Sequence, residues 1–410
     1  MKPRIGRGTL VGLVLVALSA VVYWLSDRAF DAGRGDFFYL ADALLHGRTW
    51  LEFRPGPYDV IDVGGRYYVP FAPFPALALA PLVAIVGPIQ ADVLEPVIDA
   101  VLAAVAVGLC WMLLGRIGVR RLADRVWLTV LFGFSTPLWW VTTRGGVWHT
   151  GQIVATILTL GCLIELWGRR RGLVVGLLAG AAFLTRAPLA FAVPLYALLL
   201  DPRSAPEASD GPVGTRDQAH LSRARWLARE WLALAVGVLP AIAFFLWYNA
   251  VRFGSPLESG YGLAALPDWL ERQRQIGLFS LAHVGMNVDY LFLHLPTQIP
   301  DPPFFRPDGL GLSVLLTSPA LLLAAFADWR SRRSWLLLGA AIAVLVPTLL
   351  YYGGGWLQYG YRYFLDSIPF LFVLAATAVA RSGRLGWTWR ALITFGVVVN
   401  LGGVYWADKF

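Results

Sequence analysis

The chain of 410 residues is 57% hydrophobic and 15% charged, with a mean hydropathy of +0.61, which excludes an ordinary soluble globular protein. Apolar runs of about 18–20 residues recur along its length, each long enough to span a bilayer's hydrocarbon core, so the composition indicates an all-α polytopic membrane protein. The net charge of +8 does not require nucleic acid as a partner, because membrane proteins concentrate Lys and Arg in cytoplasmic loops.

The first apolar run, 9–25, follows Lys2, Arg4 and Arg7 and has no convincing cleavage site, so residues 1–26 are interpreted as a retained signal-anchor helix. Two shorter runs between 172 and 200 are separated by the sequence TRAP and predict a tight helical hairpin. Together with the longer runs they predict about 11 transmembrane helices. The longer runs are 9–25, 91–114, 126–143, 150–168, 231–251, 310–327, 335–352, 363–380 and 389–406.

The apolar stretch 73–87 decides on which side of the membrane every later loop lies. As a helix it would reach only about 22 Å at 1.5 Å per residue, and Pro81 would interrupt its hydrogen bonds. If it does not cross, the later basic clusters lie on the same side as the N-terminus, whereas a crossing would separate them from it. Short basic loops favour the cytoplasm. We therefore predict a re-entrant or interfacial segment, with the N-terminus cytoplasmic.

This topology divides the chain into outer and inner regions. The extracytoplasmic loop 27–90 contains a short amphipathic helix, with Leu40 and Leu44 on its apolar face and Asp42 and His46 on the other. A second, proline-rich extracytoplasmic loop, 252–309, predicts a wall or lid of a cavity, and the inner loop 201–230 predicts a flexible cytoplasmic connector. The remaining units are the transmembrane core 91–200, the single transmembrane helix 231–251 and the C-terminal transmembrane helices 310–406.

Asp36 is the leading candidate for a catalytic group. It follows the first span, at the mouth of whatever cavity the helices enclose, and a carboxylate there could take a proton from an attacking hydroxyl or amine. The alternative is a helix N-cap, for which Asp is a preferred residue.

A second acidic group lies at helical spacing at the outer end of the span 91–114. Asp92, Glu95 and Asp99 fall on one face of that helix, and charges within spans usually face a wet interior and mark function. The alternative is favourable pairing of acids with a helix N-terminus.

Two arginines are candidates for binding a phosphate. Arg186 lies in the otherwise apolar hairpin FLTRAPLAF, and Arg362 lies among tyrosines in GYRYFLD, where Tyr361 could stack on a sugar or isoprenoid. A guanidinium presents a planar fork of donors that suits phosphate. The alternatives are snorkelling of Arg186 to the interface and an aromatic belt around Arg362.

No cofactor or metal is predicted. The five histidines show no metal-ligand spacing, and Cys110 and Cys162 both lie inside apolar runs, which argues against a disulfide framework or a thiolate metal site. Any group transfer at the outer face would therefore need a donor that is already activated.

Over about the first 200 residues the layout resembles the GT-C superfamily of membrane glycosyltransferases, especially the branch of protein O-mannosyltransferases and aminoarabinose transferases. Four motifs carry the resemblance in order: an acidic residue after the first span, a short helix, a turn with two tyrosines running into a proline-rich segment, and a later basic hairpin. Here they are Asp36, ADALLHG, DVGGRYYVPF with PFPALALAPLVAIVG, and GAAFLTRAPLAFAVP with Arg186 at its basic position.

The resemblance implies residue roles. The aminoarabinose transferases carry a Glu-Lys pair after the tyrosine, where this chain has Val69 and Pro70, so Arg66 is the nearest substitute for the donor-phosphate lysine. With Asp36 as catalytic base, Arg186, Arg362 and Arg66 are assigned to the donor phosphate. Asp99, Tyr361, Tyr67 and His149 are assigned to the sugar or the acceptor.

The resemblance implies an inverting glycosyltransferase in the plasma (inner) membrane. It would move a sugar from a polyprenyl-phosphate donor to a glycan, lipid or protein acceptor at the extracytoplasmic face, with membrane lipids and no nucleic acid as its other partners. The alternative is a non-enzymatic transporter or assembly scaffold for lipid-linked sugars.

Overall fold

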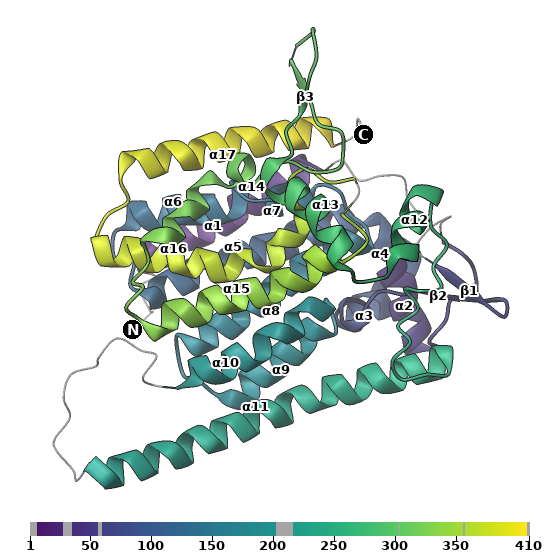
Figure 1. The fold of residues 1–410 in the computed structure, drawn as a ribbon, viewed down its shortest axis with the longest axis horizontal. Coiled ribbons are helices and arrows are strands. Elements are labelled where there is room, and N and C mark those ends of the chain that lie inside the picture. Colours follow the sequence, from purple (N-terminus) through teal and green to yellow (C-terminus); the bar gives the residue numbers. More distant parts are fainter. Residues whose placement is uncertain are drawn as a thin grey trace.

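The computed structural model describes residues 6–27, 35–55, 60–201, 216–302, 304–355 and 357–407, and the side chains of 216–222 lie outside the description. Most of the long helices lie along a common axis, as Figure 1 shows. The helices are α1 (Arg7–Leu25), α2 (Asp36–Leu45), α3 (Phe74–Val86), α4 (Pro88–Val93), α5 (Glu95–Ile117), α6 (Leu122–Phe134), α7 (Leu138–Thr142), α8 (Val147–Leu166), α9 (Gly172–Phe183), α10 (Val193–Leu200), α11 (Arg216–Phe253), α12 (Asp268–Ile276), α13 (Val284–Val288), α14 (Val314–Thr317), α15 (Arg332–Leu350), α16 (Ile368–Ser382) and α17 (Trp387–Trp406).

Shorter elements connect them. The antiparallel hairpins are β1 (Ile61–Val63) with β2 (Arg66–Tyr68), and β3 (Thr297–Gln298) with β4 (Phe305–Arg306). The short 3₁₀ and π turns are η1 (Ala187–Ala192), η3 (Leu281–His283), η4 (Asp289–Leu293), η5 (Pro319–Phe326) and η6 (Arg362–Asp366).

Most of the basic helix ends gather at one end of the bundle, which we call the arginine end. There Arg125 of α6 donates to the Trp111 carbonyl of α5 at 2.9 Å, and Arg116 of α5 donates to the Ile164 carbonyl of α8. Arg333 of α15 reaches Leu166 at the end of α8 at 3.2 Å. These bonds join four helices, and two of them reach carbonyls in the last turn of α8, which a helix terminus leaves without intrahelical partners.

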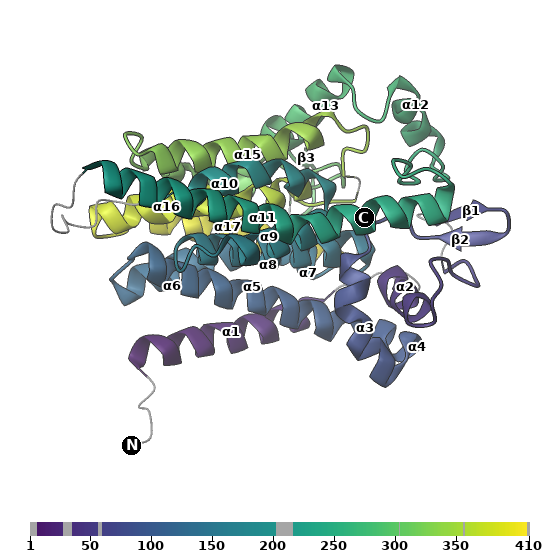
Figure 2. The same ribbon diagram turned by 90° about the horizontal axis from the view of Figure 1, so that it is seen from below.

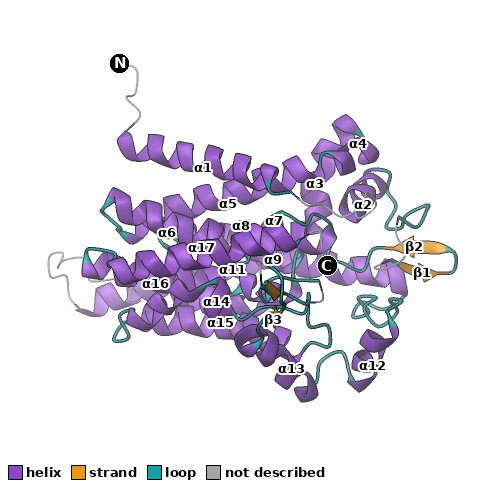
Figure 3. Cartoon of the chain, turned by 90° about the horizontal axis from the view of Figure 1, so that it is seen from above, coloured by secondary structure: helices purple, strands orange, loops and turns teal. Residues whose placement is uncertain are grey.

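The opposite end, which we call the site end, carries the elements that are not part of the bundle. Figure 2 shows α2, α3, α4 and the β1–β2 hairpin together at this end, with α12 on the same side. Figure 3 shows α1 starting at the arginine end, whereas α17 ends nearer the site end. The arginines that join the helix ends and the short elements α2, α3, α4 and β1–β2 therefore lie at opposite ends of the molecule.

Both ends of α3 lie at the site end. At its start, the Phe74 amide donates to the Leu184 carbonyl at 2.9 Å, beside the connection from α9 to η1. Its other end leads directly into α4, where Asp92 packs against Gly35. The helix continues through Pro81 and packs on α2.

Among the described residues, five helices are long and apolar enough to cross a membrane: α1, α5, α8, α11 and α15. Four shorter apolar segments accompany them: 74–86, 172–183, 187–200 and 368–382. The chain is thus a multi-pass helical membrane protein. Four predicted spans are not single helices. The run 91–114 is divided between α4 and α5, and the run 363–380 between η6 and α16. The run 126–143 breaks into α6 and α7 at Ser135–Pro137, because Pro137 cannot donate to the helical ladder, and 310–327 forms only α14 and η5.

The predicted connector 201–230 is shorter than expected. Residues 202–215 lie outside the described part, but α11 already begins at Arg216 and runs for 38 residues. Its apolar half packs closely on α9, where a Cβ on Gly176 would stand 2.2 Å from the Leu234 carbonyl oxygen. Glycine therefore lets these two backbones approach more closely than any side chain would allow.

Candidate active site

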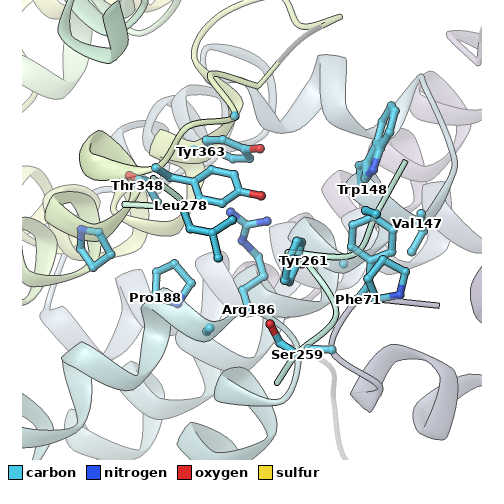
Figure 4. Close-up of a pocket in the computed structure, with 18 of the residues that line it drawn as sticks. Phe71, Val147, Trp148, Arg186, Pro188, Ser259, Tyr261, Leu278, Thr348 and Tyr363 are labelled. Carbon is cyan, nitrogen blue, oxygen red and sulfur yellow. The ribbon is translucent and has the colours of Figure 1, made fainter. Parts of the chain in front are cut away.

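A cavity of about 400 Å³ opens at the site end between the start of α8, the α9–η1 connection, the end of α11, α12 and the end of α15. Aromatic residues and prolines make up nearly half of its lining, and Figure 4 shows several of them. Three arginines line it, namely Arg186, Arg252 and Arg362, and its described lining holds no Asp or Glu. An apolar pocket with a few convergent polar groups is the usual form of a ligand site.

Arg186 extends into this cavity from the break between α9 and η1. Its backbone is extended there, with φ −148° and ψ 113°, where Arg186 is the N-cap of η1. Its Nε donates to both carboxylate oxygens of Asp366, at 2.9 and 2.7 Å. The outer part of the guanidinium points between Tyr363 and Tyr261 in Figure 4. Arg186 is therefore paired with a buried acid and is not the lone cation that a snorkelling side chain would be.

Arg362 approaches the same place from η6. Its guanidinium carbon lies 4.8 Å from the ring centroid of Tyr363 and 5.6 Å from that of Trp148. The guanidinium carbon of Arg186 lies 5.3 Å from the same Tyr363 centroid. One tyrosine thus lies beside two guanidinium groups, an arrangement that cation–π attraction favours. The two arginines assigned to one phosphate do line one cavity, although they are far apart in sequence.

The backbone around Arg362 is held by buried amide side chains. The Gln152 amide donates to the Arg362 carbonyl at 2.9 Å, and the Arg362 amide donates to Gln358 Oε1 at 3.0 Å. Gly355, which also lines the cavity, has φ +86°, a conformation that glycine adopts without strain. The chain can therefore turn sharply at Gly355 beside the cavity.

Arg252 differs from Arg186 because all three of its guanidinium nitrogens are hydrogen-bonded within the protein. Its Nε, Nη1 and Nη2 donate to the Tyr248 carbonyl (3.2 Å), the Val69 carbonyl (2.7 Å) and Asn249 Oδ1 (2.9 Å). The bond to Val69 ties the end of α11 to the segment that precedes α3. We infer that Arg252 shapes the cavity wall, whereas Arg186 directs donors into the cavity.

Tyr361 does not face the cavity, contrary to the prediction that it stacks on a ligand. Its ring is 1% exposed, and its hydroxyl donates toward Asn287 Oδ1 at 3.1 Å and the Thr348 carbonyl at 3.3 Å. The lining tyrosine is Tyr363, two residues later. The extended backbone of Tyr361 and the turn of η6 place the two rings in different directions.

Asp99 and His149 are buried beside the cavity and do not line it. Asp99 accepts a hydrogen bond from the Thr150 hydroxyl, 2.9 Å from each carboxylate oxygen, and Glu95 accepts one from the Gly146 amide at 3.0 Å. Both acids therefore hold the start of α8, as acids near a helix N-terminus do. His149 Nδ1 lies 2.7 Å from the Gly145 carbonyl oxygen. These residues position Val147 and Trp148, which do line the cavity.

Asp36 is buried at the start of α2 and does not itself line the cavity, whereas its neighbour Phe37 does. The N-cap of α2 is Gly35, so the predicted alternative role of Asp36 as N-cap does not match the structure. Asp92 lies nearby, where it accepts a hydrogen bond from the Tyr39 hydroxyl at 3.3 Å. Burial raises the pKa of Asp92 above its ordinary value, although the bond from Tyr39 opposes this. A second carboxyl thus lies close to the first turn of α2.

Arg66 and Tyr67 lie in β2 and do not reach the cavity. Arg66 is exposed, and its guanidinium carbon lies 5.0 Å from the ring centroid of Trp50. Tyr67 pairs through its backbone with Leu51. The residues that follow, Pro70–Pro73, form part of the cavity wall. The structure therefore separates Arg66 and Tyr67 from Arg186 and Arg362.

Sequence reasoning missed several residues of the site. Asp366 stands four residues after Arg362, a spacing that would suggest a pair between those two, yet it bonds Arg186, which lies 180 positions away. Trp148, Tyr261 and Trp269 also line the cavity. Aromatic residues are common throughout this chain, at 14%, so no local signal distinguished them from lipid-facing rings.

The sequence and the structure were compared with those of known proteins. No protein-family model matches the sequence, and no curated protein sequence matches it either. The crystal structure of ArnT from Cupriavidus metallidurans bound to undecaprenyl phosphate is similar, with a TM-score of 0.51 and 16% identity over 92% of this chain. The chain has a GT-C fold.

The predicted GT-C resemblance is therefore confirmed at the level of the fold. The chain spans 61% of the length of ArnT. A weaker similarity joins the GT-C fold of this chain to the archaeal oligosaccharyltransferase AglB from Archaeoglobus fulgidus in complex with an inhibitory peptide and a dolichol-phosphate. There the TM-score is 0.45 and the identity 13%, over 97% of this chain and 55% of AglB. A shared fold does not by itself transfer an activity, so function is argued from the cavity.

Proposed function

We propose that this protein is a membrane glycosyltransferase that moves a sugar from a polyprenyl-phosphate donor to an acceptor. The observation that carries the proposal is the pair of guanidinium groups beside Tyr363, Arg186 and Arg362, inside an aromatic cavity at the end opposite the arginine end. ArnT, whose GT-C fold this chain shares, was crystallised with undecaprenyl phosphate.

The chemistry of the cavity suits both parts of such a donor. A guanidinium makes charge-assisted, often bidentate bonds to phosphate oxygens. The apolar wall, which includes Phe71, Phe245 and Leu266, suits the isoprenoid next to the phosphate, because apolar surface gains free energy when it leaves water. Trp148 and Tyr261 offer flat faces against which a sugar ring can pack.

The proposed orientation puts the arginine end in the cytoplasm and the cavity at the extracytoplasmic face of the plasma membrane. Arg116, Arg125 and Arg333 would then follow the positive-inside rule, with α1 starting in the cytoplasm and α3 re-entering from the outside.

Labelling with a membrane-impermeant maleimide in intact cells tests this orientation. Gln90 and Arg120 are exposed, whereas the native Cys110 and Cys162 are buried. Cysteine at position 90 should react and cysteine at position 120 should not. The reverse pattern would contradict the orientation.

The proposed reaction is a single displacement that inverts the anomeric centre. The acceptor oxygen forms a bond to the anomeric carbon while the bond from that carbon to the phosphate oxygen breaks, and the lipid phosphate leaves with the electron pair. Asp36 takes the proton of the acceptor, a role for which carboxylates are often used. The arginines stabilise the negative charge that builds up on the departing phosphate.

Transfer by the purified protein tests the function. Nanodiscs containing the full chain would be given a panel of polyprenyl-phosphate sugars, with release of polyprenyl phosphate as the readout. In parallel, envelope glycans with and without the gene would be compared by mass spectrometry. A difference in glycans that Asp36→Asn fully restores would favour the alternative of a non-enzymatic transporter or scaffold, because neither needs a general base.

A further inference from the structure

Asp366 is a buried carboxylate that the proposed reaction does not use. Its side chain is 0% exposed, and both of its oxygens accept from Arg186 Nε. It does not line the cavity. It bonds the Nε of the guanidinium and neither of the two terminal nitrogens.

This position lets Asp366 act on the charge of the site without touching the ligand. The described lining contributes three arginines and no carboxylate, so the negative charge bonded to Arg186 opposes a strongly positive wall. Asp366 also holds the Nε of Arg186, which leaves the two terminal nitrogens to face the cavity, as Figure 4 shows. Orientation and charge are therefore two separable effects of one residue.

The phosphate of the donor and that of the product differ in charge, so the negative charge of Asp366 affects their binding differently. In the donor the phosphate is a diester with one negative charge, because one oxygen carries the lipid and another the sugar. After transfer the C–O bond to the sugar is broken and the phosphate is a monoester with a charge of about −1.5 to −2 at neutral pH. Added positive charge at the site would therefore strengthen binding of the product more than binding of the donor.

We propose that Asp366 is a specificity-determining residue that lowers the positive charge around the phosphate, so that the site does not prefer the departing monoester over the diester donor. This inference rests on the proposed function, since it needs a lipid phosphate at Arg186 and Arg362.

Asp366→Asn separates charge from geometry. The amide has nearly the same shape, and its oxygen can still accept from Arg186 Nε, but the negative charge is lost. At a separation of roughly 7 Å, on the order of the width of one guanidinium, a unit charge changes binding by about threefold per unit of ligand charge even at the dielectric constant of water. The variant should therefore bind a dianion better relative to a monoanion.

The experiment compares two probes, a polyprenyl phosphate and its methyl diester with the same lipid chain. Dissociation constants for both are measured with the full-length protein in detergent at pH 8. In Asp366→Asn, and in the smaller Asp366→Ser, the preference for the monoester over the diester should rise by about threefold or more. Asp366→Glu keeps the charge and should leave the preference unchanged. Inhibition of transfer by added polyprenyl phosphate should strengthen in the first two variants only.

The outcomes distinguish this inference from the proposed function. If wild-type protein binds neither probe, the proposed function fails. If the wild type binds both but the two charge-removing variants weaken both probes in parallel, Asp366 only orients Arg186, and the specificity role is overturned. An unchanged preference in both variants overturns it as well.

Discussion

Arginines lie at both ends of the bundle, but they bond in different ways. At the arginine end, Arg125 and Arg333 donate to the backbone carbonyls of neighbouring helices, and Arg390 pairs with the buried Asp124 at 3.0 Å. At the site end, Arg186 gives one nitrogen to Asp366, and both it and Arg362 stand beside Tyr363 at a cavity.

The difference separates a structural use of arginine from a binding use. A guanidinium whose donors reach carbonyls of other helices ties those helices together, whereas one that directs donors into a cavity can bind an anion. Arg252 shows that location alone does not decide, because it lines the cavity and yet all three of its nitrogens are bonded within the protein.

If only the site end takes part in the reaction, the largest expected effect on the transfer rate is that of a substitution at Asp36. Asp36→Asn should lower the transfer rate by about 10²–10⁴-fold, because the amide keeps the shape but cannot accept the proton. Single-turnover kinetics with a saturating donor measures this. Asp42→Asn, in the same helix but partly exposed, is the matched control and should retain activity. A rate within a few fold of wild type for Asp36→Asn would remove Asp36 from the mechanism.

The next effect is on donor binding. Arg186→Ala or Arg362→Ala should weaken polyprenyl-phosphate binding by about 10–150-fold, since a hydrogen bond to a charged group is worth about 1.5–3 kcal/mol. Lysine at either position should recover only part of the affinity, because a point charge replaces a fork. Affinities are measured in nanodiscs. Unchanged binding in both alanine variants would place the phosphate elsewhere.

At the arginine end, the expected effect is on stability and not on binding. Arg390→Ala removes the partner of Asp124, whose side chain is 1% exposed, and leaving a buried acceptor without its partner costs about 1–3 kcal/mol. The melting temperature in detergent should fall, while the dissociation constant for polyprenyl phosphate stays the same. A loss of phosphate affinity in a variant that remains folded would break the division between the two ends.

The smallest expected effect is at Arg66, which tests the assignment that followed from the resemblance. Arg66→Ala should change polyprenyl-phosphate affinity by less than about twofold, because an exposed charge away from the ligand is largely screened by solvent and salt. The same binding assay measures it. A loss as large as that of Arg186→Ala would mean that the β1–β2 hairpin folds over the cavity when the donor binds.

The sequence by itself determined the class of the protein and the order of its parts. Long apolar runs, the segregation of basic residues and the prolines in 73–87 predicted a multi-pass helical bundle with a segment that returns to the same side, and motifs around Asp36 and Arg186 predicted the GT-C fold. Local patterns suffice for these features because helix formation, membrane insertion and loop charge depend on neighbouring residues in the chain.

Only the tertiary structure decided which side chains share the cavity. Tyr363 rather than Tyr361 faces it, Arg66 lies outside it, and Asp366 pairs with Arg186 and not with the nearer Arg362. Asp99 and Glu95 lie in α5 but bond to the start of α8, a role that their spacing within α5 does not reveal. Each of these outcomes depends on how helices distant in sequence pack, and a local pattern carries no information about the direction of a side chain relative to a distant helix.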